Sequence, residues 1–174
     1  MGKQSLLHDS YGPVDSRVHR GKALRKQVSR TSQGGFAPAP DRRDPIEVLE
    51  EQAATRVQEL LPIRYGRMAS SPFAFFRGAA AVMAMDLATT PVSGIKAQLC
   101  GDAHLVNFGI YNSPDRRLVF DLNDFDETLP GPWEWDVKRL AASLVVAGRD
   151  NGFSEEETVK VVRGGIEQYR LAMA

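Results

Sequence analysis

The sequence predicts a small α+β fold, and three observations lead to that prediction. Apolar residues recur at spacings of three and four in two stretches between residues 46 and 87 and in two more after residue 134, as along one face of a helix. Short apolar runs bounded by turn residues lie between these stretches and indicate strands. No segment repeats, which excludes a repeat architecture.

The composition is that of a globular protein without a transmembrane helix. Charged residues make up 25% and hydrophobic residues 43% of the 174 residues, which is typical of a globular protein. No run of about 18 uncharged apolar residues could form a transmembrane helix, and the charged N-terminus is unlike a secretory signal. Cys100 is the single cysteine, so no internal disulfide can form. We therefore expect a cytoplasmic protein without a membrane partner.

Residues 1–43 are predicted to form a basic, flexible N-terminal arm. Residues 1–44 carry nine Lys or Arg and four Asp, a net charge of +5, whereas the rest of the chain has a net charge of −5. The segment 32–40 has the Gly and Pro content of a connector. The arm lacks interleaved aromatic residues and any nucleic-acid motif, so nucleic acid is not the expected partner. Binding of nucleic acid by the basic arm stays a third hypothesis.

Two helices are predicted after the arm. Asp44-Pro45 is typical of a helix start, and the apolar stripe over residues 46–60 predicts one helix that Pro62 ends. Ser71-Pro72 opens a second helix in the same way, and its apolar stripe covers residues 73–87. Both stripes are expected to pack in the core.

Strands and two further helices follow. Residues 95–100 are predicted to form a strand, and residues 108–111 and 118–121 a hairpin around a turn. A third helix is predicted over residues 135–150, before an Asn-Gly stop. A capping box at residues 154–157 starts a fourth helix.

The chain ends at Ala174, directly after the apolar stripe of the fourth predicted helix. An apolar helix face normally needs a partner to cover it. We therefore expect residues 44–174 to be a partial domain whose C-terminal part is missing.

Side chains that could do chemistry concentrate in residues 99–136. This segment has no Gly-x-Ser-x-Gly elbow, no reactive-thiol setting, too few Cys and His for zinc and no EF-hand spacing. Magnesium with a phosphate ligand fits better, because it takes oxygen donors and only one or two protein carboxylates. Asn107 and Asp124 could supply oxygens, and Asp102 could orient or deprotonate an attacking hydroxyl, as in a kinase site.

The segment Gly101-Asp102-Ala103-His104-Leu105-Val106-Asn107 resembles the catalytic loop of aminoglycoside phosphotransferases and related small-molecule kinases. More closely, the chain resembles the bacterial domain-of-unknown-function family 2252 over roughly residues 20–174. The resemblance implies an α+β fragment of a protein-kinase-like fold, with helices flanking a small β-hairpin or sheet that carries the catalytic loop. The motifs that carry it are residues 64–68, 71–78, 101–109, 120–128 and 130–140.

The kinase resemblance implies a role for each residue of the site. Asp102 would be the catalytic base, and His104 would position the loop. Asn107 and Asp124 would be metal ligands. The implied cofactors are Mg²⁺ and ATP, and the implied activity is phosphoryl transfer to a hydroxyl of an unknown small molecule or protein. The oligomeric state is left open.

Further acidic residues have secondary roles in this interpretation. Asp121 and Asp126 are alternates for the metal role, because the hairpin lengthens the interval between the Asn and the second Asp. Asp121 fits the spacing of kinases better, whereas Asp124 fits the local sequence better and is preferred. Asp136 would be structural.

One departure from the kinase pattern leaves an alternative open. A kinase needs a Gly-rich phosphate loop and a strand lysine, but the only lysine between the arm and Asp102 is Lys96, which is too close to the loop. The alternative function is a non-catalytic, pseudokinase-like module that binds nucleotide or metal. Arg64, Arg67 and Arg77 could contact phosphate or simply pair with the acidic loop.

Overall fold

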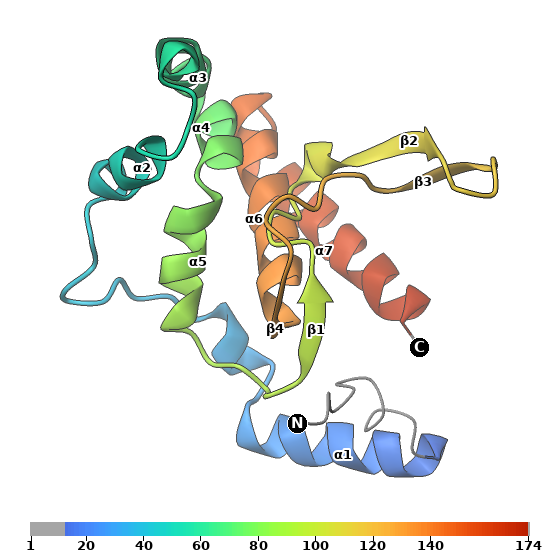
Figure 1. The fold of residues 1–174 in the computed structure, drawn as a ribbon. Coiled ribbons are helices and arrows are strands. Elements are labelled where there is room, and N and C mark those ends of the chain that lie inside the picture. Colours follow the sequence, from blue (N-terminus) through green and yellow to red (C-terminus); the bar gives the residue numbers. More distant parts are fainter. Residues whose placement is uncertain (1–12, 174) are drawn as a thin grey trace, which may run out of the picture.

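The computed structural model describes residues 13–173 as a set of helices around two small sheets (Figure 1). The α+β class predicted from the sequence is confirmed. The helices are α1 (Val14–Gln27), α2 (Pro45–Ala53), α3 (Leu61–Met68), α4 (Pro72–Gly78), α5 (Ala80–Ala88), α6 (Glu134–Asp150) and α7 (Glu155–Ala172). The strands are β1 (Lys96–Leu99), β2 (Phe108–Asn112), β3 (Leu118–Leu122) and β4 (Leu129–Pro132), and short 3₁₀ turns are η2 (Thr31–Gly34), η3 (Gln58–Leu60) and η4 (Leu105–Asn107).

Each of the two sheets has two antiparallel strands. β1 pairs with β4, with Leu99 opposite Leu129, and β2 pairs with β3, with Phe108 opposite Leu122. The β2–β3 hairpin extends away from the helices (Figure 1). The first strand and the hairpin were predicted, whereas β4 was not, because its sequence Leu129-Pro130-Gly131-Pro132 is poor in strand formers. Proline is tolerated on edge strands, and a two-stranded sheet has no other kind.

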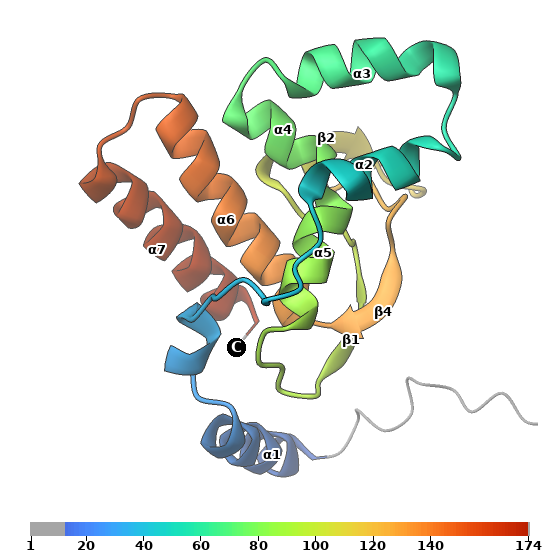
Figure 2. The same ribbon diagram turned by 90° about the vertical axis from the view of Figure 1, so that its left-hand side faces the viewer.

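The third and fourth predicted helices, α6 and α7, are confirmed and run side by side (Figure 2). A reciprocal capping box at Ser154 starts α7, as predicted. A Cβ on Gly148 would lie 2.8 Å from Oγ1 of Thr158, so a glycine is needed for this close approach. At the other end of the pair, the rings of Trp133 and Tyr169 stack with centroids 6.4 Å apart.

The predicted single helix over residues 46–60 is wrong. α2 ends at Ala53, and Pro62 lies in the first turn of α3 instead of following a helix end. A proline in the first turn lacks only an N–H that would have no helical partner there, so it starts a helix as readily as it stops one. Nε2 of Gln58 donates to the carbonyl oxygens of Ala53 at 2.9 Å and Arg56 at 3.0 Å, which satisfies the end of α2.

The second predicted helix is also two helices, α4 and α5, with a break at Ala79 (φ −115°, ψ 37°). Two arginine side chains bind carbonyl oxygens near the break. Nη2 of Arg139 donates to Phe76 at 2.9 Å, and Nη2 of Arg64 donates to Gly78 at 2.8 Å. These long-range partners make the break stable, and the sequence pattern alone does not reveal them.

Part of the arm is helical. Residues 14–27 form the helix α1, and none of its side chains is buried. The end of the arm is tied to the helices, because Arg42 donates to both carboxylate oxygens of Asp86 in α5 at 2.6 and 2.9 Å. The first part of the predicted arm, residues 1–12, lies outside the described residues.

The best buried residues surround the end of β1. Leu99, Cys100 and Ala103 are only 2–3% exposed. Met68 of α3 and Leu87 of α5 extend this core toward the N-terminal helices. No helix within residues 13–173 is long and apolar enough to cross a membrane.

Candidate functional site

The loop Gly101–Asn107, which follows β1, is fixed by close backbone packing. Gly101 has a φ of +87°, a left-handed conformation that favours glycine. A Cβ at this position would lie 2.0 Å from the carbonyl oxygen of Glu127, so the loop packs directly against the segment after β3. The N–H of His104 donates to the carbonyl oxygen of Asp102 at 2.8 Å and tightens the turn.

Polar side chains on one face of α6 bind the backbone of this loop. The carboxylate of Asp136 accepts hydrogen bonds from the N–H groups of Cys100 at 2.7 Å and Gly101 at 3.1 Å. Burial raises the pKa of Asp136, although these two N–H groups act in the opposite direction. Oγ of Ser143, which is 0% exposed, accepts from the N–H of Leu105 at 3.0 Å. Asp136, Arg139 and Ser143 are three and four residues apart and so share this face.

Arg139 is the charge partner of Asp102. Its Nε donates to Oδ1 of Asp102, and both side chains are buried, with Arg139 only 2% exposed. The guanidinium lies 4.4 Å from the ring centroid of Phe76, and Nη1 lies 3.4 Å from Sδ of Met83. A buried carboxylate without a partner is costly, so the ion pair with Arg139 stabilises Asp102 and holds it in one orientation.

His104 is buried beside the same carboxylate. Its Nε2 lies 3.8 Å from Oδ2 of Asp102, and its Nδ1 accepts a hydrogen bond from the N–H of Val106 at 3.2 Å. Burial lowers the pKa of His104, and this outweighs the opposite influence of Asp102. The neutral ring is the form that can accept at Nδ1, so His104 supports the turn of the loop.

Asn107 joins the loop to the segment after β3. Its Nδ2 donates to the carbonyl oxygen of Asp102 at 2.8 Å, and its own carbonyl oxygen accepts from the N–H of Asn123 at 3.0 Å. Cys100 adds a second link, because its thiol donates to the carbonyl oxygen of Asp124 at 3.0 Å. Burial raises the pKa of that thiol, so Cys100 is a buried structural residue.

Asp102, His104 and Asn107 of the loop line one cavity of about 840 Å³. The acidic wall comes from the loop and the segment after β3, and burial raises the pKa of Glu127, as do the neighbouring carboxylates. All five predicted site residues line this cavity, whereas Asp121, the alternate for the metal role, does not. The charged and polar residues of the lining include Asp102, His104, Asn107, Asp124, Asp126 and Glu127, with Arg56, Arg64, Arg67 and Arg77 among the helical residues.

The oxygen donors of this cavity suit magnesium. Asn107 carries an Oδ1 that receives no hydrogen bond from residues 13–173, and Asp124 and Asp126 add carboxylates. Within the same residues no group of three or more Cys, His, Asp or Glu side chains is arranged to hold a metal ion. A site with one or two carboxylates and an amide is what Mg²⁺ uses when phosphate completes its shell.

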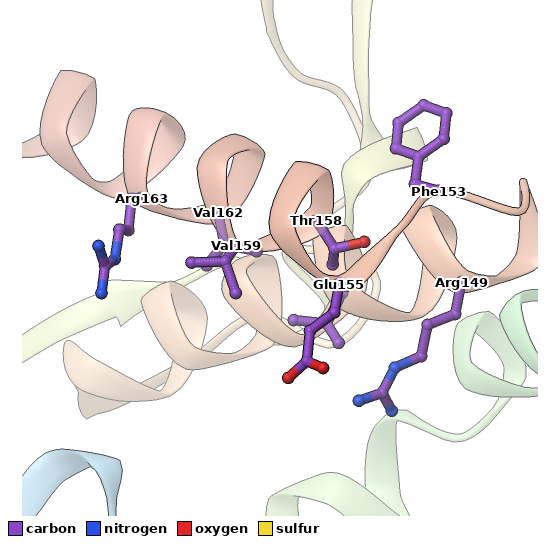
Figure 3. A pocket seen from close by; sticks show the side chains of 8 residues that line it. Arg149, Phe153, Glu155, Thr158, Val159, Val162 and Arg163 are labelled. Atoms are coloured by element: carbon purple, nitrogen blue, oxygen red, sulfur yellow. The ribbon is translucent and has the colours of Figure 1, made fainter.

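A second cavity, of about 500 Å³, lies between α6 and α7 (Figure 3). Its lining includes the apolar side chains of Val145, Val159 and Val162 and the charged side chains of Arg149 and Arg163. It offers no carboxamide, histidine or paired carboxylates for catalysis. The chemistry therefore favours the larger cavity at the 101–107 loop.

Sequence reasoning missed the residues that act on the loop from a distance. Arg139 and Ser143 were not singled out, and neither was Glu127 as a member of the acidic wall. A signal for the first two existed, because Asp136, Arg139 and Ser143 place polar groups on a helix face that is otherwise apolar. For Glu127, no spacing rule predicts its approach to Gly101.

A family of bacterial proteins matches most of this chain. The model of the family described as "Uncharacterized protein conserved in bacteria (DUF2252)" matches residues 56–174, which include the loop, the acidic wall and the arginines of the cavity. The chain belongs to this family. No curated protein and no solved structure matches the chain. The family description assigns no activity, and the residues that could carry one are those that line the cavity.

Proposed function

We propose that this protein transfers a phosphoryl group from ATP to a hydroxyl acceptor in a magnesium-dependent reaction. The observation that carries the proposal is that Asp102, Asn107 and Asp124 line one cavity. This is the set of groups that kinases use, a base and two metal ligands.

Asp102 is the base in this proposal. Oδ1 is bound by Arg139, and Oδ2 remains to accept the proton of the acceptor hydroxyl as its oxygen attacks the γ-phosphorus. The bond from the γ-phosphorus to the oxygen that bridges it to the β-phosphate then breaks, and ADP leaves with that oxygen. Arg139 holds the carboxylate in one orientation, so its role is positioning.

The remaining residues bind and orient. Asn107 and Asp124 would hold Mg²⁺, with Asp126 as the adjacent carboxylate, and the ion when bound supplies positive charge to the phosphate oxygens. Asp136 fixes the backbone before Asp102 through two hydrogen bonds, which limits the movement of the base.

The test is ATP turnover by the wild-type protein and by Asp102→Asn, with magnesium and a panel of hydroxyl compounds. Asn cannot accept the proton, so we expect turnover to fall at least about a hundredfold while Mg²⁺-dependent ATP binding is retained. Equal turnover by the two proteins would contradict the role of Asp102.

One observation favours a second candidate, a non-catalytic module that binds nucleotide or metal. Asp102 is buried, and one of its oxygens is already occupied by Arg139, as suits a structural ion pair. This candidate predicts Mg²⁺-dependent ATP binding with no release of ADP by wild-type protein under any acceptor condition.

A further inference from the structure

The mostly helical part of the cavity lining, which we call the basic wall, carries four arginines. Arg64 and Arg67 lie three residues apart on α3, and Arg77 lies in the last turn of α4. Arg56, from the turn after α2, lines the same cavity. Figure 2 shows α2, α3 and α4 gathered at one end of the molecule. Four cationic side chains from three consecutive segments therefore line the same cavity.

The two helices that carry most of this wall are held together tightly. A Cβ on Gly78 of α4 would lie 2.5 Å from Sδ of Met68, so α3 and α4 touch at this point. Nη2 of Arg64 donates to the carbonyl oxygen of Gly78 at 2.8 Å, which fixes one edge of its guanidinium. The backbones of the two helices and the Arg64 side chain are therefore held in place before a ligand binds, which lowers the entropic cost of binding.

The basic wall is not neutralised by the acidic wall. Within residues 13–173, none of the four arginines forms a salt bridge, although carboxylates line the same cavity. Burial lowers the pKa of Arg64, and the nearby charge of Arg56 lowers it further. If the two walls served only to stabilise each other, they would be in contact. Like charges held close on each wall, with a cavity between, favour a ligand that brings charge of both signs.

The side-chain type points to phosphate. A guanidinium presents a planar fork of donors that matches phosphate oxygens, and a divalent cation on that phosphate matches the acidic wall. Within residues 13–173, no lysine lines the cavity, and Lys96 lies in β1. Arginine is therefore the cationic side chain available to a phosphate there.

We propose that Arg64, Arg67 and Arg77 form a phosphate-binding site on α3 and α4, which takes the place of a strand lysine. The metal in this inference rests on the proposed function. Binding of phosphate by the arginines needs no metal. Two sources share the chemistry, the phosphate chain of a nucleotide and a phosphorylated acceptor.

The test uses Arg67→Gln/Arg77→Gln, because these side chains are exposed and their loss leaves the Arg64 hydrogen bond intact. Tripolyphosphate without metal is titrated into wild-type and variant protein by calorimetry. We expect affinity to fall about tenfold or more, since two charged contacts are lost. Arg163→Gln, an exposed arginine of the second cavity, is the matched control and should bind as wild type does.

The outcomes separate the two proposals. Three results would overturn the phosphate site. Wild-type protein could fail to bind tripolyphosphate, the double variant could bind it with unchanged affinity, or Arg163→Gln could lose as much affinity as the double variant. Asp124→Asn should keep metal-free tripolyphosphate binding; if it also keeps full Mg²⁺-dependent ATP binding, the proposed function fails while the phosphate site stands. Parallel titrations with ATP and glycerol phosphate identify the source, and tighter binding of either one supports the site.

Discussion

Arg139 of α6 donates through Nε to Asp102, and the two side chains form an ion pair inside the protein. The same guanidinium binds the carbonyl oxygen of Phe76 at the break between α4 and α5. One buried side chain therefore connects the loop that lines the cavity with the helices that carry the basic wall. The geometry of the site depends on this connection.

Replacement of Arg139 should destabilise the fold strongly. Arg139→Ala leaves the buried carboxylate of Asp102 without a partner, and we expect a loss of about 3–5 kcal/mol in the free energy of unfolding. Urea denaturation measures the change. Arg149→Ala, at an exposed position of the same helix, is the control and should change stability by less than about 0.5 kcal/mol. A loss below about 1 kcal/mol for Arg139→Ala would show that the pair contributes little.

Gly101 should not tolerate a side chain. Gly101→Ala combines a positive φ, which costs about 1–2 kcal/mol, with a Cβ only 2.0 Å from the carbonyl oxygen of Glu127. Gly152→Ala is the matched control, because Gly152 also has a positive φ but has nothing within 4 Å of its Cβ position. We expect the loss at Gly101 to exceed that at Gly152 by at least about 1 kcal/mol in thermal or urea unfolding. Equal losses would mean that the loop can move away from Glu127.

Asp136→Asn should loosen the loop. The amide has one acceptor oxygen, so one of the N–H groups of Cys100 and Gly101 loses its partner, at a cost of about 1–3 kcal/mol. Hydrogen exchange of these two amides should accelerate. Asp150→Asn on the same helix is the control, because the Asp150 carboxylate accepts from the hydroxyl of half-buried Ser71 and has no hydrogen bond to the loop, so both exchange rates should stay unchanged. Unchanged exchange in Asp136→Asn would refute the role of Asp136 in fixing the loop.

Features that depend on neighbouring residues were predicted correctly from the sequence, whereas features that depend on residues distant in the chain were not. The capping box at Ser154 and the hairpin turn are short-range patterns, and α7 and the β2–β3 pair form as predicted. The break at Ala79 depends on carbonyl partners supplied by Arg139 and Arg64, which are distant in sequence. A period of three and four residues cannot reveal such partners.

The same distinction applies to the candidate site. Asp102, His104 and Asn107 lie in one short segment, so their proximity followed from the sequence. Their contact with α6 and with Glu127 depends on the packing of distant elements, and the sequence did not predict it. The arginines were recognised as charged, but whether they pair with the loop or line a cavity depends on the positions of α3 and α4.

Acid should destabilise the protein through His104. Its pKa is lowered in the folded protein, so below about pH 6.5 the unfolded chain binds a proton that the folded protein does not, and stability falls as pH falls. Above that pH the contribution is constant. The effect is measured as the free energy of unfolding at pH values from about 5 to about 8, a range that brackets the ordinary histidine pKa of about 6.5. His104→Gln, which cannot titrate, should flatten the curve in this window, and an unchanged slope would contradict the buried neutral state.

The proposed function requires that Asn107 and Asp124 hold the metal through which nucleotide binds. The most direct measurement is calorimetric titration of ATP into wild-type, Asp124→Asn and Asp121→Asn proteins, each with and without Mg²⁺. Asp121 lies on β3, carries the same charge and does not line the cavity, which makes it the matched control. We expect the magnesium-dependent gain in ATP affinity to be lost in Asp124→Asn and kept in Asp121→Asn. A gain that persists in Asp124→Asn, or that is lost only in Asp121→Asn, would contradict the proposed function.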